Sequence, residues 1–442
     1  MKKRTQLILA VAIIAIIAVS IAAYYYLTVP PERTIKIGLV ASLTGPGSAE
    51  GADMQRAAIL AVEEINAAGG VYVSEYGRNL TVTLEIGDDK TKPADGVIAV
   101  EELIKSKNVD VLVGGLSSSV TLASQVPAID NNVPFVITGA STPQVTRRTD
   151  KNTSYMFHYC TIIDDYSETI VKFLNHTVRP TLIDEGRMDP ERNLRLAMLV
   201  RNDAYGIGCY DTTVRFINDL GLPIEIVEYQ KFEPGATDFT TQLTLIQAAK
   251  PDAVYHAGLT AESSNLVKQG LQNVGLKTIY IAVEVCQTPQ FYEILGSWGD
   301  YQILESKFGS KAASYSDAVD TYIANYMQRW KDAQGNPIIP GMMGADTYDA
   351  IYLICKAIEN AGTLDKAKIR DEIENIEMDQ MLIMMKNGMI WFDQNHEIDP
   401  ISFIEQMTWN STTSQLTTYI VYPDSLKQRD FELPPDYENE YS

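Results

Sequence analysis

From residue 35 onward, short apolar runs typical of strands alternate with longer stretches whose apolar residues recur at helical spacing. The strand-like runs of this first series are IKIGLVA (35–41), LTVTLEI (80–86), VDVLVGG (109–115) and PFVITGA (134–140). Helix-length segments separate these runs, and the first of them ends at Gly69-Gly70. This order predicts a parallel sheet with helices on both faces, because neighbouring parallel strands need a long crossover connection.

The same alternation restarts after residue 158. Its strand-like runs are LRLAMLV (194–200), PIEIVEYQKF (223–232), DAVYHAG (252–258) and KTIYIAVE (277–284). A chain of 442 residues is also too long for one ordinary core. We therefore predict the α/β class, with two Rossmann-like lobes, each a parallel sheet flanked by helices. Residues 301–422 are expected to complete both lobes, and ligands of such sheets bind at the carboxyl ends of the strands.

Charge and motif content narrow the function. The chain has 36 Lys and Arg against 57 Asp and Glu, a net charge of −21. So acidic a body repels phosphate backbones, which excludes nucleic-acid binding. G-x-S-x-G, P-loop, G-x-G-x-x-G and H-E-x-x-H motifs are absent, and the four His are not spaced as metal pairs. We predict no enzymatic activity, no cofactor and no metal.

The N-terminal residues have the pattern of a membrane-targeting segment. Residues 1–4 (MKKR) are basic, residues 7–23 hold no charge, and three tyrosines follow at 24–26. This pattern predicts a membrane anchor within residues 1–33, with the N-terminus inside the cell. A cleaved signal peptide is the alternative, because small residues near Ala22 and Ala23 suit a peptidase. Either way the body is expected outside the cytoplasm. At the other end, residues 423–442 are polar and acidic, which predicts a disordered tail.

Four cysteines do not make a disulfide framework in an exported body of this size. We expect most of them to be buried as small apolar residues. A single bridge between Cys209 and Cys286 stays open as an alternative.

Seven segments, in this order and spacing, resemble the Leu/Ile/Val-binding protein family of ABC transporter solute receptors. They are IKIGLVASLTGPGSAEG (35–51), AVEEINAAGG (61–70), EIGDDKTKP (85–93), VGGLSSS (113–119), PFVITGASTP (134–143), NDAYGIG (202–208) and GADTYDAIYLICKAIENAG (344–362). The resemblance implies a periplasmic-binding-protein fold of the first type, with three crossings between the lobes. It places lobe 1 at 34–158 plus 301–386 and lobe 2 at 159–300 plus 387–422. The crossings are expected near residues 155–160, near 301–308 and before 391–393.

Candidate ligand contacts on the first lobe follow two strands. The three serines 117–119 open a helix, where hydroxyls and free backbone N–H groups can hold a carboxylate. Helix capping is the alternative role for these serines. The resemblance implies that Ser117 contacts a ligand carboxylate. It also implies that the Ala140 carbonyl and the Thr142 hydroxyl hold the ligand, although the Thr142 hydroxyl could instead cap the turn before Pro143.

Two further candidates come from the second lobe. Glu284 ends a β-rich run, where a carboxylate is out of place unless it faces a site. The resemblance implies that Glu284 pairs with a ligand ammonium group and that Tyr205 stacks on the ligand. The alternatives are a solvated loop carboxylate for Glu284 and an ordinary core aromatic for Tyr205.

Two positions depart from the branched-chain pattern, since Glu50 and Thr260 stand where the family often has aromatic residues. Glu50 in the pocket would favour a ligand with an extra donor or cation, such as a basic amino acid, an amide or a urea-like solute. Alternatively, Glu50 only complements the dipole in the first turn of its helix.

The resemblance therefore implies an extracellular, monomeric substrate-binding protein that closes on an amino acid or related small solute and delivers it to an ABC permease. A ligand-sensing ectodomain of the same fold is the alternative. Only about six residues precede the apolar stretch, so such a receptor would need a separate membrane partner to carry its signal.

Overall fold

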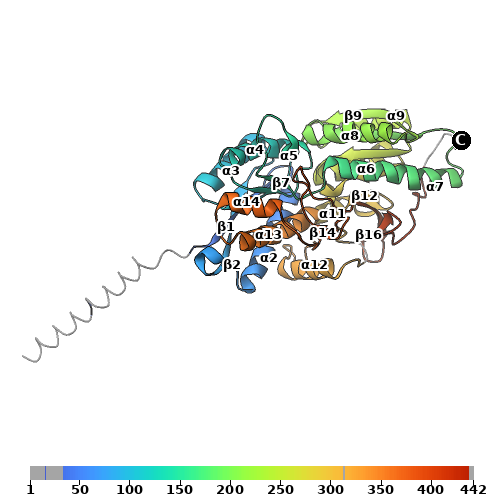
Figure 1. The fold of residues 1–442 in the computed structure, drawn as a ribbon. Helices are drawn as coiled ribbons and strands as arrows, with labels where there is room; N and C mark the ends of the chain where they lie inside the picture. Colours follow the sequence, from blue (N-terminus) through green and yellow to red (C-terminus); the bar gives the residue numbers. More distant parts are fainter. Residues whose placement is uncertain (1–14, 16–32, 312–313, 438–442) are drawn as a thin grey trace, which may run out of the picture.

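The computed structural model describes residues 15, 33–311 and 314–437. Apart from residues 15 and 33, the predicted anchor or signal segment lies outside these residues. Within them, no helix has both the length and the hydrophobicity needed to cross a bilayer. Two α/β lobes lie side by side, each built around its own sheet (Figure 1). The predicted fold class is confirmed.

Lobe 1 has a five-stranded sheet in the order β4-β1-β5-β6-β7, and every neighbouring pair is parallel. Buried faces of α3 and α4 cover one side of this sheet, and α2 packs with α13 on the other. The strands are β1 (Ile35–Ala41), β4 (Val82–Asp88), β5 (Val111–Gly114), β6 (Phe135–Ile137) and β7 (Met156–His158). The helices are α2 (Ser48–Ala67), α3 (Pro93–Lys105), α4 (Ser118–Asp130), α5 (Gln144–Arg147), α12 (Asp317–Arg329), α13 (Met342–Ala361) and α14 (Lys366–Glu374).

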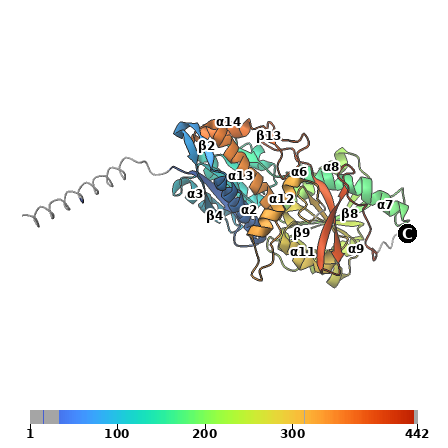
Figure 2. The ribbon, with the colours of Figure 1, turned by 90° about the horizontal axis from the view of Figure 1, so that it is seen from below.

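Lobe 2 has a seven-stranded sheet in the order β16-β15-β12-β11-β10-β8-β9. The five neighbouring strands β9, β8, β10, β11 and β12 are parallel. At the other edge, β15 and β16 add an antiparallel hairpin, seen as the long red ribbon of Figure 2. The strands are β8 (Leu194–Arg201), β9 (Ile224–Phe232), β10 (Ala253–Ala257), β11 (Ile279–Ala282), β12 (Ile303–Ser306), β15 (Phe403–Asn410) and β16 (Gln415–Tyr422). The helices are α6 (Ile163–Phe173), α7 (Arg179–Asp184), α8 (Ala204–Asp219), α9 (Thr240–Ala249), α10 (Thr260–Gln269) and α11 (Pro289–Leu295).

Two short antiparallel pairs complete the described strands. They are β2 (Val71–Val73) with β3 (Arg78–Leu80), and β13 (Met378–Asp379) with β14 (Met389–Ile390).

In the described residues the chain crosses between the lobes at three places, and the third lies later than predicted. β12 belongs to the lobe 2 sheet, so the second crossing follows Ser306, within the expected range 301–308, and only the lobe boundary predicted at 300/301 is too early. The segment after residue 387 still packs on lobe 1, because Phe392 contacts Phe157 with ring centroids 5.3 Å apart and the backbone of Glu397 pairs with that of His158. The third crossing therefore precedes β15 directly, and the boundary predicted at 386 is too early.

The described part of the predicted disordered tail is ordered. Phe431, Leu433 and Tyr437 are buried against lobe 2. Phe431 packs edge-on against Phe173 at 5.5 Å between ring centroids, and the Tyr437 hydroxyl donates to the Asp252 carbonyl at 3.2 Å. Aromatic anchors among the polar residues explain the difference, since burying them offsets the entropy of ordering a polar segment.

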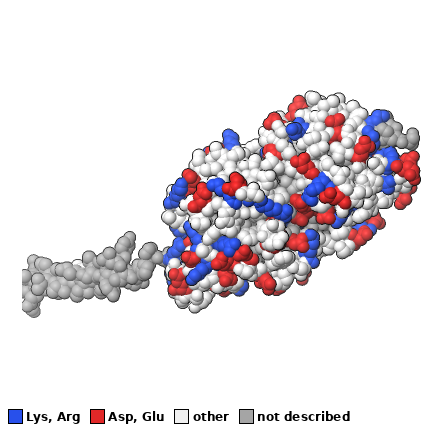
Figure 3. Space-filling view, turned by 45° about the horizontal axis from the view of Figure 1, so that its top comes forward, with Lys and Arg blue, Asp and Glu red and all other residues white. Residues whose placement is uncertain are grey.

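All four cysteines are buried free thiols. On the surface, acidic and basic side chains intermingle over the face drawn in Figure 3, and neither sign forms a continuous patch there.

Candidate functional site

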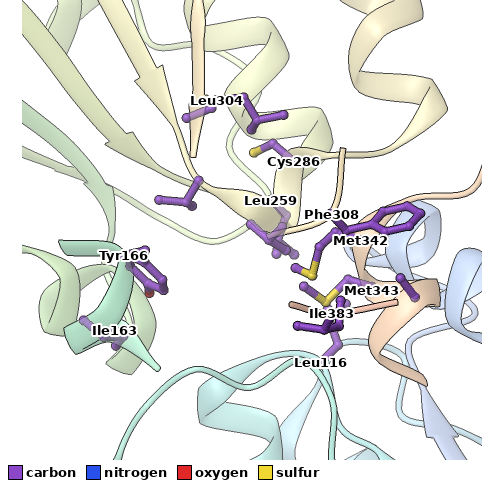
Figure 4. Packing of buried hydrophobic residues seen from close by; sticks show 14 of the residues in the cluster. Leu116, Ile163, Tyr166, Leu259, Cys286, Leu304, Phe308, Met342, Met343 and Ile383 are labelled. Carbon is purple, nitrogen blue, oxygen red and sulfur yellow. The ribbon is translucent and has the colours of Figure 1, made fainter. Parts of the chain in front are cut away.

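A pocket lies between the lobes, at the carboxyl ends of strands from both sheets, which is where open α/β sheets bind ligands. It encloses about 370 Å³ of space not filled by atoms, part of it open to solvent. Lobe 1 supplies one wall and lobe 2 the other. The lining residues are Leu116, Ser117, Ser118, Gly139, Ser141, Tyr166, Arg201, Tyr205, Leu259, Val283, Glu284, Val285 and Met343. Leu116, Leu259 and Met343 are among its apolar members, and Figure 4 shows them within the buried apolar packing.

The lobe 1 wall is built on the turn from β5 into α4. Gly114 and Gly115 have φ angles of 109° and 82°, in the region that glycine adopts without strain. This turn brings Ser117 to the N-cap position of α4, yet its side chain makes no capping hydrogen bond. The Ser117 hydroxyl lies 3.4 Å from that of Ser119. Helix capping therefore does not explain Ser117, and its hydroxyl lines the pocket beside the N–H groups of the first helical turn.

After β6, the residue that lines the pocket is a different one from the two that were predicted. Ser141 lines the pocket, and its hydroxyl lies 3.1 Å from that of Tyr166 on α6. Ala140 and Thr142 are buried but are not among the lining residues. The Ala140 carbonyl already accepts a hydrogen bond from the His158 ring. Burial lowers the pKa of His158 to about 4, so this ring is neutral at pH 7 and donates through Nε2.

Lobe 2 brings two long side chains to the pocket from β8 and the start of α8. Tyr205 lines it, and its buried hydroxyl has no hydrogen-bond partner among the described residues. Arg201 also lines it, although no sequence motif indicated this residue. Its guanidinium lies 3.0 Å from the Asp203 carboxylate and 3.3 Å from that of Glu262. Because Asp203 caps α8 and Glu262 lies in the first turn of α10, Arg201 ties together two helices that begin at the pocket.

Glu284 is the acidic residue of the pocket wall. It begins the short helical turn that follows β11 and is almost fully buried. Its Oε2 atom accepts a hydrogen bond from the Thr161 hydroxyl, whereas Oε1 has no hydrogen bond among the described residues. The Lys307 ammonium group lies 3.5 Å from Oε2.

Lys307 lies on the second crossing and is fully buried. Its ammonium group donates to the Thr161 hydroxyl at 2.6 Å and lies 3.0 Å from Asp346 Oδ2 on α13. Burial acts to lower the pKa of Lys307, but the carboxylates of Asp346 and Glu284 outweigh it and raise that pKa. Burial raises the pKa values of both acids, and the Lys307 charge opposes each shift.

Glu50 and Thr260, the two positions that depart from the branched-chain pattern, meet each other instead of lining the pocket. The Thr260 N–H group, at the start of α10 in lobe 2, donates to Glu50 Oε1 of lobe 1 at 2.8 Å. Both residues are fully buried, and Glu50 Oε2 has no hydrogen-bond partner among the described residues. Burial raises the pKa of Glu50 from 4.5 to about 7. This pair is a direct link between the lobes.

The sequence carried signals for the residues that were missed. Lys307 follows a strand-like run that ends at the second crossing, and Asp346 interrupts the apolar face of a helix. Charged residues in such places are seldom buried unless they are paired. No group of three or more His, Cys, Asp or Glu side chains in the described residues is arranged to hold a metal ion.

Comparison with known proteins gives a consistent result. The family model described as "Periplasmic binding protein" matches residues 34–408. The chain is 26% identical to Leu/Ile/Val-binding protein homolog 3 of Brucella melitensis biotype 1, over 81% of this chain and 86% of that protein.

Two solved structures share the fold. One is LivJ, a branched-chain amino acid transporter substrate-binding protein from Streptococcus pneumoniae, in complex with isoleucine. It has a TM-score of 0.72 and 21% identity, over 88% of this chain and 100% of that one. The other is a solute-binding protein of an ABC transporter from Rhodopseudomonas palustris BisB5, in complex with 3,4-dihydroxybenzoic acid. It has a TM-score of 0.70 and 20% identity, over 88% of this chain and 98% of that one.

Proposed function

This chain belongs to the periplasmic binding protein family, and on that premise we propose that it is the substrate-binding protein of an ABC importer, capturing an amino-acid-like solute between its lobes. The role proposed is capture and delivery by lobe closure, without chemical conversion of the solute. One observation carries the proposal. Ser117 and Glu284 line a single pocket from opposite lobes, and they offer the complementary partners that a zwitterion needs.

A zwitterion leaves water only if both of its charges find partners. In the proposed complex, the ligand carboxylate accepts from the Ser117 hydroxyl and from N–H groups at the start of α4. The ligand ammonium group takes Glu284 Oε1, the carboxylate oxygen without a hydrogen bond in the described residues. A ligand held in this way bridges the lobes, so its binding energy favours closure.

The rest of the pocket favours an apolar ligand side chain. Leu116, Met343, Leu259, Val283 and Val285 contribute apolar surface from both lobes. A relative named as a Leu/Ile/Val-binding protein supports the same class. Fold similarity alone does not identify the class of ligand, because the Rhodopseudomonas palustris neighbour was solved with an aromatic acid that has no amino group.

The N-terminal pattern supports a location outside the cytoplasm, where the protein would load an ABC permease. The basic residues 1–4 and the uncharged residues 7–23 suit an anchor or an export signal.

A thermal-shift screen of the full-length protein tests the proposal. The panel contains the common amino acids, amides, urea and 3,4-dihydroxybenzoate at millimolar concentration. An amino acid is expected to raise the unfolding midpoint, because a ligand that binds only the folded state stabilises it by mass action. A response confined to the aromatic acid, or no response to any compound, would contradict the amino-acid proposal.

A further inference from the structure

Lys307 occupies an unusual position for a lysine. It is fully buried on the second crossing between lobes, and it contacts a residue of the first crossing, the pocket wall of lobe 2 and a helix of lobe 1. These contacts are Thr161, Glu284 and Asp346. No other described lysine is as fully buried. A buried ammonium group is costly unless it is paired, so the arrangement around it calls for an explanation.

The distances rank the two acidic partners of Lys307. Asp346 Oδ2 lies 3.0 Å from the ammonium nitrogen, and Glu284 Oε2 lies 3.5 Å away. Asp346 is therefore the closer partner, and Glu284, the one that lines the pocket, is held more loosely. Thr161 reinforces the looser contact, because it accepts from Lys307 and donates to Glu284.

Charge balance links this cluster to a ligand. One ammonium group between two carboxylates leaves either one net negative charge or one extra proton on the acids. A ligand ammonium group would balance that charge or replace that proton. A buried carboxylate with no cation nearby protonates, and a neutral Glu284 could not pair with an ammonium ion.

We propose that Lys307 is a positioning residue that serves as the internal counter-ion of Glu284. It keeps this carboxylate ionised in the unliganded protein and shares it with the ammonium group of the ligand. The inference rests on the proposed amino-acid ligand for its second half, whereas its first half concerns the protein alone. Asp346 lets Lys307 keep a partner when Glu284 turns to the ligand.

Other ionisable groups also act on the pair. Those that face Glu284 besides Lys307 are Glu305 on β12, Asp346 on α13, Tyr205 on α8 and Cys160 on the first crossing. Lys307 is likewise influenced by Cys160, in addition to its partners Asp346 and Glu284. The remaining ionisable groups that act on Lys307 are Glu305, Asp349, His158 and Asp165. Lys307 is the only cation in this set at neutral pH, because His158 is uncharged there. Removing its charge should therefore change the protonation of Glu284.

The first experiment needs no ligand. Glutamate side-chain carboxyl carbons of the full-length protein are labelled with ¹³C and titrated by NMR, and the Glu284 signal is identified by its loss in Glu284→Gln. The wild type and the charge-preserving Lys307→Arg variant should show an ionised Glu284 at pH 7. In Lys307→Met, Glu284 should be protonated at pH 7 and titrate at least one pH unit higher. An unchanged Glu284 titration in Lys307→Met would overturn the proposal.

Asp346→Asn covers the case in which Lys307→Met does not fold. This variant keeps the lysine and removes its closer partner, so Lys307 should pair with Glu284 alone. The midpoint of the Glu284 titration should then fall by at least half a unit. No shift, or a shift to higher pH, would contradict the assignment.

The second experiment measures ligand binding by calorimetry with leucine and with its deaminated analogue, 4-methylpentanoate. Lys307→Met should lose at least tenfold in leucine affinity at pH 7 and recover part of it at pH 9, while binding of the analogue stays the same. Equal losses for both compounds at both pH values would show a packing role only and would overturn the proposal. If the wild type binds no amino acid, the proposed function fails, and the NMR titration still decides the role of Lys307.

Discussion

The two walls of the interlobe pocket present different kinds of polar group. On lobe 1 the polar lining consists of the hydroxyls of Ser117, Ser118 and Ser141, next to the start of α4. On lobe 2 it consists of ionisable side chains, and the two charged lining residues, Arg201 and Glu284, both come from there. Each of these two charges is already paired within the protein.

This contrast suggests that the two lobes recognise different groups of the ligand. Uncharged donors on a rigid turn can bind a carboxylate before closure, because they need no counter-charge of their own. Paired charges on the opposite wall contribute only after closure, when the ligand becomes part of their network. Lobe 1 would then orient any small carboxylate, and lobe 2 would select those that also carry an ammonium group.

The largest expected effect comes from removing the lobe 2 charge. Glu284→Gln should weaken binding of the responding amino acid by about 2–3 kcal/mol, because a charge-assisted bond is lost in a buried site. Its effect on the deaminated analogue should be small. Calorimetry with both compounds measures the difference, and Asp150→Asn, on an exposed carboxylate, serves as the control. Equal losses for both compounds would break the proposed division between the walls.

The pH dependence of binding should reveal the Glu50 link between the lobes. We expect lobe opening to expose Glu50 and to return its pKa from about 7 toward the ordinary value of 4.5, so that closure takes up a proton. Closure is then favoured below pH 4.5 and loses that advantage as the pH rises through 7, with affinity falling about tenfold between pH 6 and 8. Glu262 and Cys286 are the other ionisable groups that act on it.

Titrations at several pH values compare the wild type with Glu50→Gln. The variant keeps an acceptor for the Thr260 N–H group and should show a flat profile. A fall of equal size in the variant would mean that another group carries the pH dependence.

A smaller loss is expected from the lobe 1 wall. Ser117→Ala should cost about 1 kcal/mol, because one neutral hydroxyl bond is removed while the N–H groups of α4 remain. The loss should be equal for the amino acid and for its deaminated analogue, since both carry the carboxylate. A loss confined to the amino acid would mean that the ligand ammonium group binds at the lobe 1 wall, which would contradict the proposed orientation.

The smallest effect is expected at Thr142, which is buried beside the pocket without lining it. Thr142→Ala should reduce affinity about twofold, clearly less than Ser117→Ala measured in the same calorimeter. If the two losses are equal, the carboxylate cradle extends to the end of β6, as the family resemblance implies.

The comparison also shows how far sequence reasoning reaches in this molecule. Strand periodicity predicted two α/β lobes, because the core-facing pattern is local and repeats. The lobe boundaries at 300/301 and 386/387 were placed too early, because β12 and the segment around Phe392 join their lobes through long-range contacts that a local sequence pattern does not show. Phe431 and Tyr437 lie in a polar context, so composition alone predicted disorder for a segment that packs.

Some site residues could be predicted from the local sequence, and others are brought together only by long-range contacts. Ser117, Tyr205 and Glu284 follow strand ends, and they line the pocket. Glu50 and Thr260 lie 210 positions apart, so their contact could not be read from either neighbourhood. Lys307 was missed for the same reason, because its partners come from three separate parts of the chain.

A crystal structure of the protein with its responding amino acid would reveal the orientation of the ligand between the two walls. The ligand carboxylate is expected within hydrogen-bond distance of Ser117 Oγ and of the N–H groups at the start of α4. The ligand ammonium group is expected on Glu284 Oε1, with Lys307 still in contact with Asp346. A ligand in the reverse orientation, or one bound entirely to a single lobe, would contradict this expectation.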